Sequence, residues 1–532
     1  MILISSAAYI EQDLALEVGR LPPAFLPIGN KRLFEHQVEL LQPLNQPIYL
    51  SLPESYKLSS YDEKRLDELT VKHLVVPDGL TLGNSVLFCW SATGVQHDSL
   101  TILHGDTLFF NINIYGNDFI STHINTGAYS RAKVSLNVGD NKHYNSDFVE
   151  DEQLVLSGLF SFSRPQLLMQ GILYNKGDFI GGIEHYTKHC ELNENSTGSW
   201  LDFGHLNSFF RSRSLMTTQR AFNDLIMEPR IVTKSSIDKR KMLAESNWFK
   251  TLPRELSLHT PALVSDYTES EVDATYILEY LYLLPLNDLL VFGRLSDAYW
   301  RYIFQSAFDI SQQFACFRPT DFNFQFANEI YLNKTLQRIN KLRQSTFWEV
   351  VLAHGFIEGK SLEALALRSA QDIMPVSMEH VSIVHGDYCF SNILFDSRTQ
   401  ALKLIDPRGI DNSGNITIYG DRRYDIAKLY HSVVGCYDFI IAGHYRINGL
   451  EISFYDDKRI QNLELIFDSI FFKSGAFNKI EILAINIHLF ISMLPLHADK
   501  PDRQKAMLLN AWRLYQQLYE LKNDCNTNGG SI

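Results

Sequence analysis

One short stretch in the C-terminal half of the chain restricts its fold more than any other part of the sequence. An apolar run at 381–384 leads into His-Gly-Asp at 385–387, and Asn392 lies five residues after the aspartate. A second apolar run, at 402–405, is followed by Asp406. Short apolar runs bounded by turn-forming residues are typical of buried strands. The sequence therefore predicts two strands that each deliver an aspartate to a turn.

This spacing suits phosphoryl transfer. A carboxylate at a strand end can accept the proton of a hydroxyl nucleophile, while an amide and a second carboxylate can hold a metal ion against phosphate oxygens. Phosphoryl transfer depends on positioning and on neutralising charge, so it requires few other groups. The alternative is a hairpin in which Asp and Asn only shape turns. The agreement of two motifs in order and spacing favours the catalytic interpretation.

The pattern His-x-Asp-x4-Asn, followed by a strand ending in Asp, resembles the aminoglycoside phosphotransferase and choline kinase group of small-molecule kinases. The resemblance implies that Asp387 is the catalytic base, that Asn392 and Asp406 are Mg²⁺ ligands, and that ATP is the phosphoryl donor. A protein kinase is less favoured, because Asp406 is followed by Pro-Arg-Gly and no activation-loop signature is evident.

The segment before this stretch has the features of a lobe that covers a nucleotide. A predicted strand, 231–236, contains Lys234, and an amphipathic helix at 239–252 contains Glu245. By the same resemblance, Lys234 contacts the α and β phosphates, Glu245 is its ion-pair partner, and Glu279 begins the hinge beside the adenine. The alternatives are a solvated lysine at a strand end and an exposed helix acid.

The Gly-rich loop typical of protein kinases is missing from this lobe, and Arg220 and Asn223 are the residues that could reach a phosphate in its place. Downstream of residue 291 the chain reads as mainly helical. Helices are expected at 298–317, 329–353, 361–373, 460–472, 479–494 and 505–521. This half of the chain is therefore predicted to be a bilobal, kinase-like α+β domain.

Strand and helix patterns alternate over the first 215 residues. A buried-type strand is expected at 1–4 and a helix at 34–41. Further strand candidates lie at 48–52, 73–76, 100–103 and 154–162, with helical stretches between several of them. This alternation predicts a Rossmann-like α/β domain whose mostly parallel sheet has helices on both faces.

Three motifs in this region have chemical content. A predicted strand ends in Gly-Asp at Asp106, residues 82–86 form a small polar turn suited to a base or a sugar, and Asp202 lies in Trp-Leu-Asp-Phe-Gly at 200–204. In addition, residues 26–33 read Leu-Pro-Ile-Gly-Asn-Lys-Arg-Leu. Together these resemble the sugar-phosphate nucleotidyltransferases. The resemblance implies that Asp106 and Asp202 hold the Mg²⁺ that binds the phosphates of a second NTP (CTP, GTP or UTP).

The first domain also departs from that family. The family's Gly-rich phosphate loop corresponds here to residues 5–13, which contain no glycine but include Glu11 and Asp13, and Ala24 occupies the usual lysine position. Side chains at each loop position hinder close approach of a phosphate, and the two acids repel it. Two interpretations follow: a working nucleotidyltransferase with an altered loop, or a fold kept for binding or scaffolding.

Composition limits the partners. The net charge of −13 does not indicate a nucleic-acid surface. The six cysteines are scattered without CxxC spacing, which fits a reducing cytoplasm better than a disulfide framework or a zinc site. No apolar run approaches 18 residues, so no membrane insertion is expected. The partners are therefore nucleotides and a small-molecule acceptor; the oligomeric state stays open, a homo-oligomer included.

The sequence thus predicts four segments: 1–215 nucleotidyltransferase-like, 216–290 small kinase lobe, 291–525 large helical lobe, and 526–532 a disordered tail. The resemblances imply a bifunctional enzyme that phosphorylates a sugar, polyol or amino alcohol and then couples the phosphate to an NTP, for capsule or lipopolysaccharide synthesis. The alternative is a single-activity kinase with an inactive, nucleotidyltransferase-like first domain.

Overall fold

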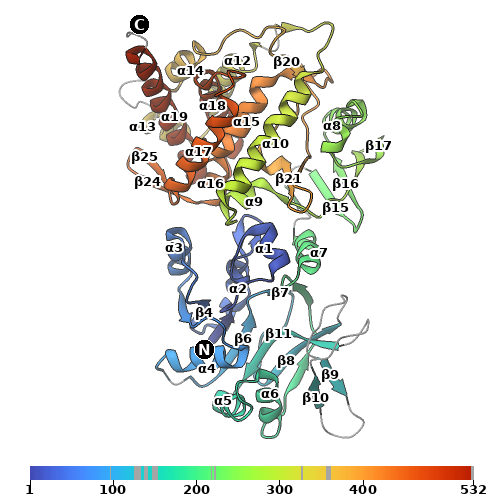
Figure 1. Ribbon diagram of the computed structural model, residues 1–532, viewed down its shortest axis with the longest axis vertical. Helices are drawn as coiled ribbons and strands as arrows, with labels where there is room; N and C mark the ends of the chain where they lie inside the picture. Colours follow the sequence, from blue (N-terminus) through green and yellow to red (C-terminus); the bar gives the residue numbers. More distant parts are fainter. Residues whose placement is uncertain are drawn as a thin grey trace. The chain divides into compact units, whose positions relative to one another are not determined.

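The computed structural model describes residues 1–95, 97–124, 133–136, 142–145, 154–216, 219–220, 223–324, 328–354 and 361–528. At 133–136, 142–145, 219–220, 223–224, 354 and 525–528 it describes the backbone alone. The chain divides into two units, Met1–Thr217 and Thr218–Ile532, whose elements are labelled in Figure 1.

Four parallel strands form one side of the sheet in the first unit. They stand in the order β6 (Leu100–His104), β1 (Ile2–Ser5), β4 (Ile48–Pro53) and β5 (Val71–Val76). The chain runs outward from β1 to β4 and β5, and then returns to place β6 on the other side of β1. The strand order therefore reverses between β1 and β6, which is where open α/β sheets bind ligands.

Antiparallel strands extend this sheet beyond β6. β11 (Leu154–Phe162) pairs with β6 and with β8 (Phe119–Ile124). The remaining strands of the sheet are β9 (Lys133–Leu136), β10 (Lys142–Asn145) and β12 (Asn193–Asn195). The unit also contains two small antiparallel pairs, β2 (Pro27–Ile28) with β3 (Lys31–Arg32) and β7 (Thr107–Phe110) with β13 (Ser199–Asp202).

Helices cover both faces of the sheet. Leu3 on one face belongs to a core that includes residues of α4 (Leu82–Ala92), α5 (Pro165–Tyr174) and α6 (Phe179–Thr187). Ile2 and Ile4 point to the other face and are also fully buried. The other helices are α1 (Gln12–Val18), α2 (Leu33–Leu41), α3 (Ser60–Glu68) and α7 (Leu206–Met216). The predicted α/β class, with a mostly parallel sheet covered on both faces, is confirmed.

The second unit begins with a five-stranded antiparallel sheet. Its order is β14 (Gln219–Arg220), β15 (Asn223–Met227), β16 (Ile231–Ser236), β18 (Ala274–Glu279) and β17 (Leu263–Glu269). α8 (Lys239–Thr251) follows β16, and the carboxylate of Asp238 caps it by accepting from Lys241 N at 3.1 Å. The small lobe is therefore a sheet with one helix packed against it.

Helices make up most of the rest of this unit (Figure 1). They are α9 (Leu286–Val291), α10 (Asp297–Ala315), α12 (Leu332–Leu342), α13 (Trp348–His354), α14 (Leu362–Ala370), α15 (Arg422–Val433), α16 (Tyr437–Ala442), α17 (Asp457–Phe471), α18 (Lys479–Met493) and α19 (Pro501–Asn528). Among the described residues, one stretch, Lys479–His497, is long and apolar enough to cross a membrane, and 72% of it is buried inside the protein. That burial is the pattern of a core helix. The predicted α+β class is confirmed for this unit.

Short strands between these helices carry the predicted site. β20 (Val381–Ile383) pairs with β23 (Tyr419–Asp421), while β21 (Ile393–Asp396) and β22 (Ala401–Leu404) form a hairpin beside β19 (Leu284–Pro285). A further hairpin, β24 (Tyr445–Asn448) with β25 (Glu451–Phe454), lies between α16 and α17.

Two expectations about helices were wrong in part. The helix expected at 329–353 is broken into α12 and α13, and at the break the hydroxyl of Ser345 donates to Leu342 O at 2.7 Å. Residues 345 and 346 are Ser and Thr, which favour a helix less than Ala, Leu or Lys do. The last helix continues through Asn528, so residues 526–528 are helical where a disordered tail was expected; residues 529–532 lie outside the described part.

Candidate active sites

The loop after β20 holds the predicted base, Asp387. The preceding Gly386 has φ 77°, and a methyl group on it would lie 2.6 Å from Arg408 Cβ. The backbone N–H groups of His385 and Gly386 donate to the two carboxylate oxygens of Asp425, at 2.7 and 2.9 Å. Burial raises the pKa of Asp425 to about 7. Asp425 at the start of α15 therefore fixes the loop.

Both carboxylate oxygens of Asp387 have a donor. Asn392 Nδ2 donates to Oδ2 at 3.0 Å, and Lys428 Nζ lies 2.8 Å from Oδ1. The side chain of Asp387 is 40% exposed. Burial of the carboxyl acts to raise its pKa, but the Lys428 ammonium outweighs that effect and lowers the pKa of Asp387. An ionised carboxylate with fixed orientation and solvent access is suited to accept a proton.

The predicted nucleotide lysine lies between two carboxylates. Lys234 Nζ is 2.5 Å from Glu245 Oε2 and 2.9 Å from Asp406 Oδ1. Burial acts against the charge of Lys234, but the two carboxylates outweigh it and raise the pKa of the ammonium. Tyr276, which faces Lys234 across the β16–β18 pair, donates its hydroxyl to Glu245 Oε2 at 2.7 Å. The structure thus brings together residues of β16, α8 and the turn after β22.

Asn392 and Asp406 lie at the same end of the β21–β22 hairpin. Ile405 N donates to Asn392 O at 3.0 Å, and Asp406 follows in a left-handed turn with φ 56°. Carboxylate and amide oxygens suit Mg²⁺, which proteins commonly hold with one or two side chains plus substrate phosphates. No cluster of three or more His, Cys, Asp or Glu side chains suited to a metal occurs within the described residues. Asn392 and Asp406 therefore fit a metal that phosphate oxygens would help to bind.

The other residues predicted for this site are Glu279, Arg220 and Asn223, and the last two are only partly described. The carboxylate of Glu279 accepts from Ala262 N at 3.2 Å, so it ties the end of β18 to the chain beside β17. Arg220 and Asn223 face each other in the β14–β15 hairpin. Their side chains lie outside the described residues.

In the first unit, Asp106 and Asp202 converge on one glycine. Asp202 ends β13, which pairs with the strand that follows Asp106. A methyl group on Gly204 would lie 2.4 Å from Asp106 Oδ2 and 3.3 Å from Asp202 Oδ1. Two carboxylates so close together, beside the reversal of strand order at β6, form an anionic centre that fits a divalent cation.

The loop after β1 brings a third acid toward this centre. His205 Nδ1 is 3.6 Å from Asp202 Oδ2, and His205 Nε2 is 3.4 Å from Glu11 Oε1. The contact between Glu11 and His205 joins residues far apart in the chain, and no local pattern in the sequence predicts it.

The basic residues near that loop have partners of their own. Lys31 Nζ is 2.6 Å from Glu39 Oε1, and the Arg20 guanidinium lies 3.8 Å from the centre of the Tyr9 ring. Ala24 is fully buried. A phosphate at this loop would therefore meet neither a buried lysine at position 24 nor an unpaired Lys31.

A cavity of about 510 Å³ opens close to Asp106. It is lined by His104, Phe160 and Lys176, together with the first residues of α4 and α6. Because His104 is two residues before Asp106, the cavity lies at the carboxyl edge of the sheet, where a substrate of this fold class is expected.

Comparisons with known proteins give two kinds of similar structure. No protein-family model and no curated protein matches the sequence. The inositol-1-phosphate CTP transferase of T. maritima matches at 13% identity and a TM-score of 0.33, over 41% of this chain and 97% of that one. An aminoglycoside 2′-phosphotransferase-IIIa in its GDP complex matches at 13% identity and a TM-score of 0.36, over 56% of this chain and 91% of that one. The two families that the sequence motifs resemble are thus both present among the structural neighbours.

Proposed function

We propose that the second unit transfers the γ-phosphoryl group of ATP to a hydroxyl group of a small acceptor. The observation that carries this proposal is the position of Lys234, which contacts Glu245 on α8 and Asp406 in the turn after β22 at 2.5 and 2.9 Å. The lysine comes from the small lobe and Asp406 from the helical lobe. Their contact brings the two parts of a phosphoryl-transfer site together.

Each residue has a role in the transfer. Asp387 accepts the proton of the acceptor hydroxyl, whose oxygen forms a bond to the γ-phosphorus as the bond from that phosphorus to the β–γ bridging oxygen breaks. ADP and a phosphomonoester are the products. Lys234 neutralises charge on the α and β phosphates, and Glu245 holds it in place. Asn392 and Asp406 would hold Mg²⁺, which neutralises charge on the phosphates when bound.

We further propose that the first unit couples the new phosphate to an NTP and releases pyrophosphate. The convergence of Asp106 and Asp202 on Gly204 supports a metal-assisted nucleotidyl transfer. The product would be a nucleotide-activated sugar, polyol or amino alcohol, of the kind used in capsule or lipopolysaccharide assembly, made in the cytoplasm. This setting rests on analogy with the two families.

The rival candidate is a kinase whose first unit binds a ligand or a partner without catalysis. It is favoured by the absence of glycine from 5–13 and by the contact of Glu11 with His205. An acid at that loop repels the phosphates that a glycine loop would bind.

One assay separates these candidates. Purified protein receives ATP, Mg²⁺ and a panel of sugars, polyols and amino alcohols, with or without CTP, GTP or UTP, and products are identified by mass spectrometry. Acceptor-dependent ADP formation supports the kinase. Pyrophosphate release that needs both the acceptor and a second NTP supports the bifunctional enzyme, and kinase activity without it supports the rival. An enzyme that consumes no ATP with any acceptor would contradict the proposal.

A further inference from the structure

Four cationic side chains, Lys334, Arg338, Arg408 and Lys428, form a cluster in which Lys428 contacts Asp387. Lys428 is one helical turn after Tyr424 on α15, and Lys334 and Arg338 are likewise one turn apart on α12. Lys334 Nζ lies 5.8 Å from the centre of the Tyr424 ring, and Lys428 Nζ lies 2.8 Å from Asp387 Oδ1. Arg408, the fourth cation, follows Asp406 by two residues.

Within the part of the chain that the structure describes, only one of these cations has a carboxylate partner. Lys428 is paired with Asp387. Arg408 donates to the amide oxygen of Asn412 at 2.9 Å. Among the residues that the structure describes, Lys334, Arg338 and Arg408 form no ion pair. In a chain with a net charge of −13, three uncompensated cations in one place require an explanation.

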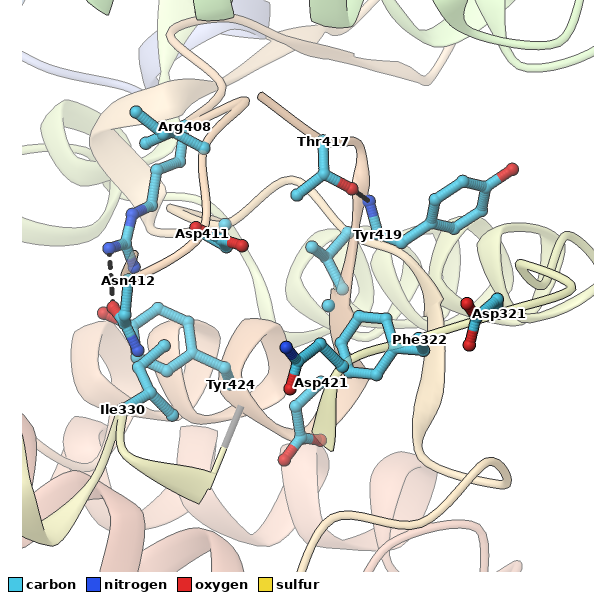
Figure 2. Close-up of a pocket in the computed structure, with 15 residues that line it drawn as sticks. Asp321, Phe322, Ile330, Arg408, Asp411, Asn412, Thr417, Tyr419, Asp421 and Tyr424 are labelled. Carbon is cyan, nitrogen blue, oxygen red and sulfur yellow. Dashed lines mark hydrogen bonds between the residues drawn. The ribbon is translucent and has the colours of Figure 1, made fainter. Parts of the chain in front are cut away.

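A cavity of about 220 Å³ lies against this cluster (Figure 2). Gly386, Arg408 and Tyr424 line it, so it reaches the residue next to Asp387. In Figure 2 the guanidinium of Arg408, Asn412, Tyr424 and Ile330 stand together at one side of the pocket.

Three carboxylates line the same cavity, and two of them are already engaged. Asp421 accepts from the Arg423 guanidinium at 2.6 Å and from the Tyr331 hydroxyl at 2.6 Å. Asp411 accepts from Ser413 and Asn415 within its own turn. Asp321 is exposed and lies across the pocket from Arg408 in Figure 2. The side of the cavity formed by Arg408 and Tyr424 is therefore electropositive.

The cations act on one another. Tyr424 acts to raise the pKa of Lys334, but burial and the charges of Arg408, Lys428 and Arg338 outweigh it and lower that pKa. Burial acts to raise the pKa of Tyr424, but Lys334, Lys428 and Arg408 lower it. An anion placed among these groups would relieve their mutual repulsion and form charge-assisted hydrogen bonds.

From this placement, and resting on the proposed kinase function, we infer that the acceptor is an anion: a hydroxyl compound that also carries a carboxylate or a phosphate. Its anionic group binds among Lys334, Arg338, Arg408 and Tyr424, and its hydroxyl faces Asp387. The hydroxyl gives its proton to Asp387 and its oxygen forms the bond to the γ-phosphorus while ADP leaves. The anionic group itself takes no part in the chemistry. Polycationic acceptors are excluded by the same charges.

The test compares acceptors that differ in charge. D-glucuronate is paired with D-glucose, glycerol 3-phosphate with glycerol, and kanamycin serves as a polycation. ADP release with each compound gives kcat/KM, and calorimetry gives its affinity for protein loaded with ADP and Mg²⁺. At least one anion should exceed its neutral counterpart by about tenfold or more, since a hydrogen bond to a charged group is worth that much. The first pair reports on a carboxylate and the second on a phosphate.

Two variants test whether Lys334 and Arg338 bind the anionic group. In Lys334→Gln/Arg338→Gln, KM and Kd for the preferred anion should rise about tenfold or more, with an unchanged KM for ATP. Lys341→Gln makes the same change of charge at an exposed position of α12 outside the cluster and serves as the matched control.

The outcomes separate this inference from the proposed function. A preference for an anion that the double variant loses and the control keeps supports it. Equal or better use of the neutral compounds or of kanamycin, or a preference that survives in the double variant, overturns it while leaving the kinase in place. If the folded wild-type protein neither binds nor hydrolyses ATP and transfers phosphate to none of the compounds, both this inference and the proposed kinase function are overturned.

Discussion

Replacing Gly409 by alanine should weaken nucleotide binding although Gly409 is not itself a site residue. Gly409 has φ 61° and lies three residues after Asp406. A methyl group on it would lie 2.2 Å from Ala244 O, in the backbone of α8. The next residue of that helix is Glu245, the partner of Lys234.

The size of the effect follows from these distances. Ordinary van der Waals contact requires the loop and α8 to separate by about 1 Å. A similar shift of Glu245 would lengthen its contact with Lys234 Nζ from 2.5 Å beyond the range of a hydrogen bond. Misplacement on this scale can cost about 10²-fold in activity. The left-handed backbone costs about 1–2 kcal/mol for a residue with a side chain, and overpacking adds about 1–3 kcal/mol.

Gly414→Ala provides the matched control. Gly414 also has a positive φ, 85°, but the nearest atom to an added methyl group would be the Arg240 side chain at 3.5 Å. The two variants therefore share the backbone cost and differ in the collision with α8. Urea unfolding and the Kd for ATP measure the two effects. Equal Kd values for ATP in the two folded variants would refute the idea that the packing of this loop against α8 fixes the position of Glu245.

Three further predictions concern single carboxylates. Asp387→Asn should lower kcat for phosphoryl transfer about 10²–10⁴-fold with little change in KM for ATP, as measured by ADP release; a smaller loss would exclude Asp387 as the base. Asp106→Asn should abolish NTP-dependent pyrophosphate release and leave ADP formation intact; loss of both activities from the folded variant would contradict two separate sites. The pKa of Asp425 is raised by burial to about 7, so its ionisation reduces stability as the pH rises from about 4 to 7, by at most about 4 kcal/mol. In Asp425→Asn, the free energy of unfolding measured with urea should fall less between pH 4 and 7 than it does in the wild type, by up to that amount. An unchanged pH dependence would show that Asp425 is ionised throughout.

Much of the fold was predictable because both units use periodic patterns. β1, β4 and β6 are short apolar runs, and in a parallel sheet covered on both faces nearly every residue of such strands is buried. β17 escaped prediction because its pattern is mixed, with polar residues on an exposed face. The break between α12 and α13 also escaped prediction, because it lies inside an otherwise helical pattern.

The site residues were predictable where a motif fixes their spacing. Asp387, Asn392 and Asp406 lie in one short segment, so a strand–turn–strand pattern is enough to place them near each other. Lys428 and Tyr276 belong to no motif, although each had a signal. Lys428 is three residues after Asp425 and so lies on the same face of α15, and Tyr276 is on the strand next to Lys234. The pairing register of β16 and β18 makes Tyr276 the neighbour of Lys234, and a single sequence does not give that register.

Glycines next to the acids give a further signal for such long-range contacts. Gly386 precedes Asp387, and an added methyl group would strike Arg408 Cβ at 2.6 Å. Gly204 lies two residues after Asp202, and there the methyl group would strike Asp106 Oδ2 at 2.4 Å. Together with Gly409 against α8, these are points at which a second segment approaches the backbone so closely that no side chain fits. A glycine within a few residues of a strand-end acid thus predicts that a second segment of the chain packs against that glycine, even when the sequence does not show which segment it is. Each of the three turns therefore has a second segment beside it, and the close approach of α8 to Gly409 is why substituting Gly409 should disturb the Lys234–Glu245 pair, to which Gly409 contributes no atom.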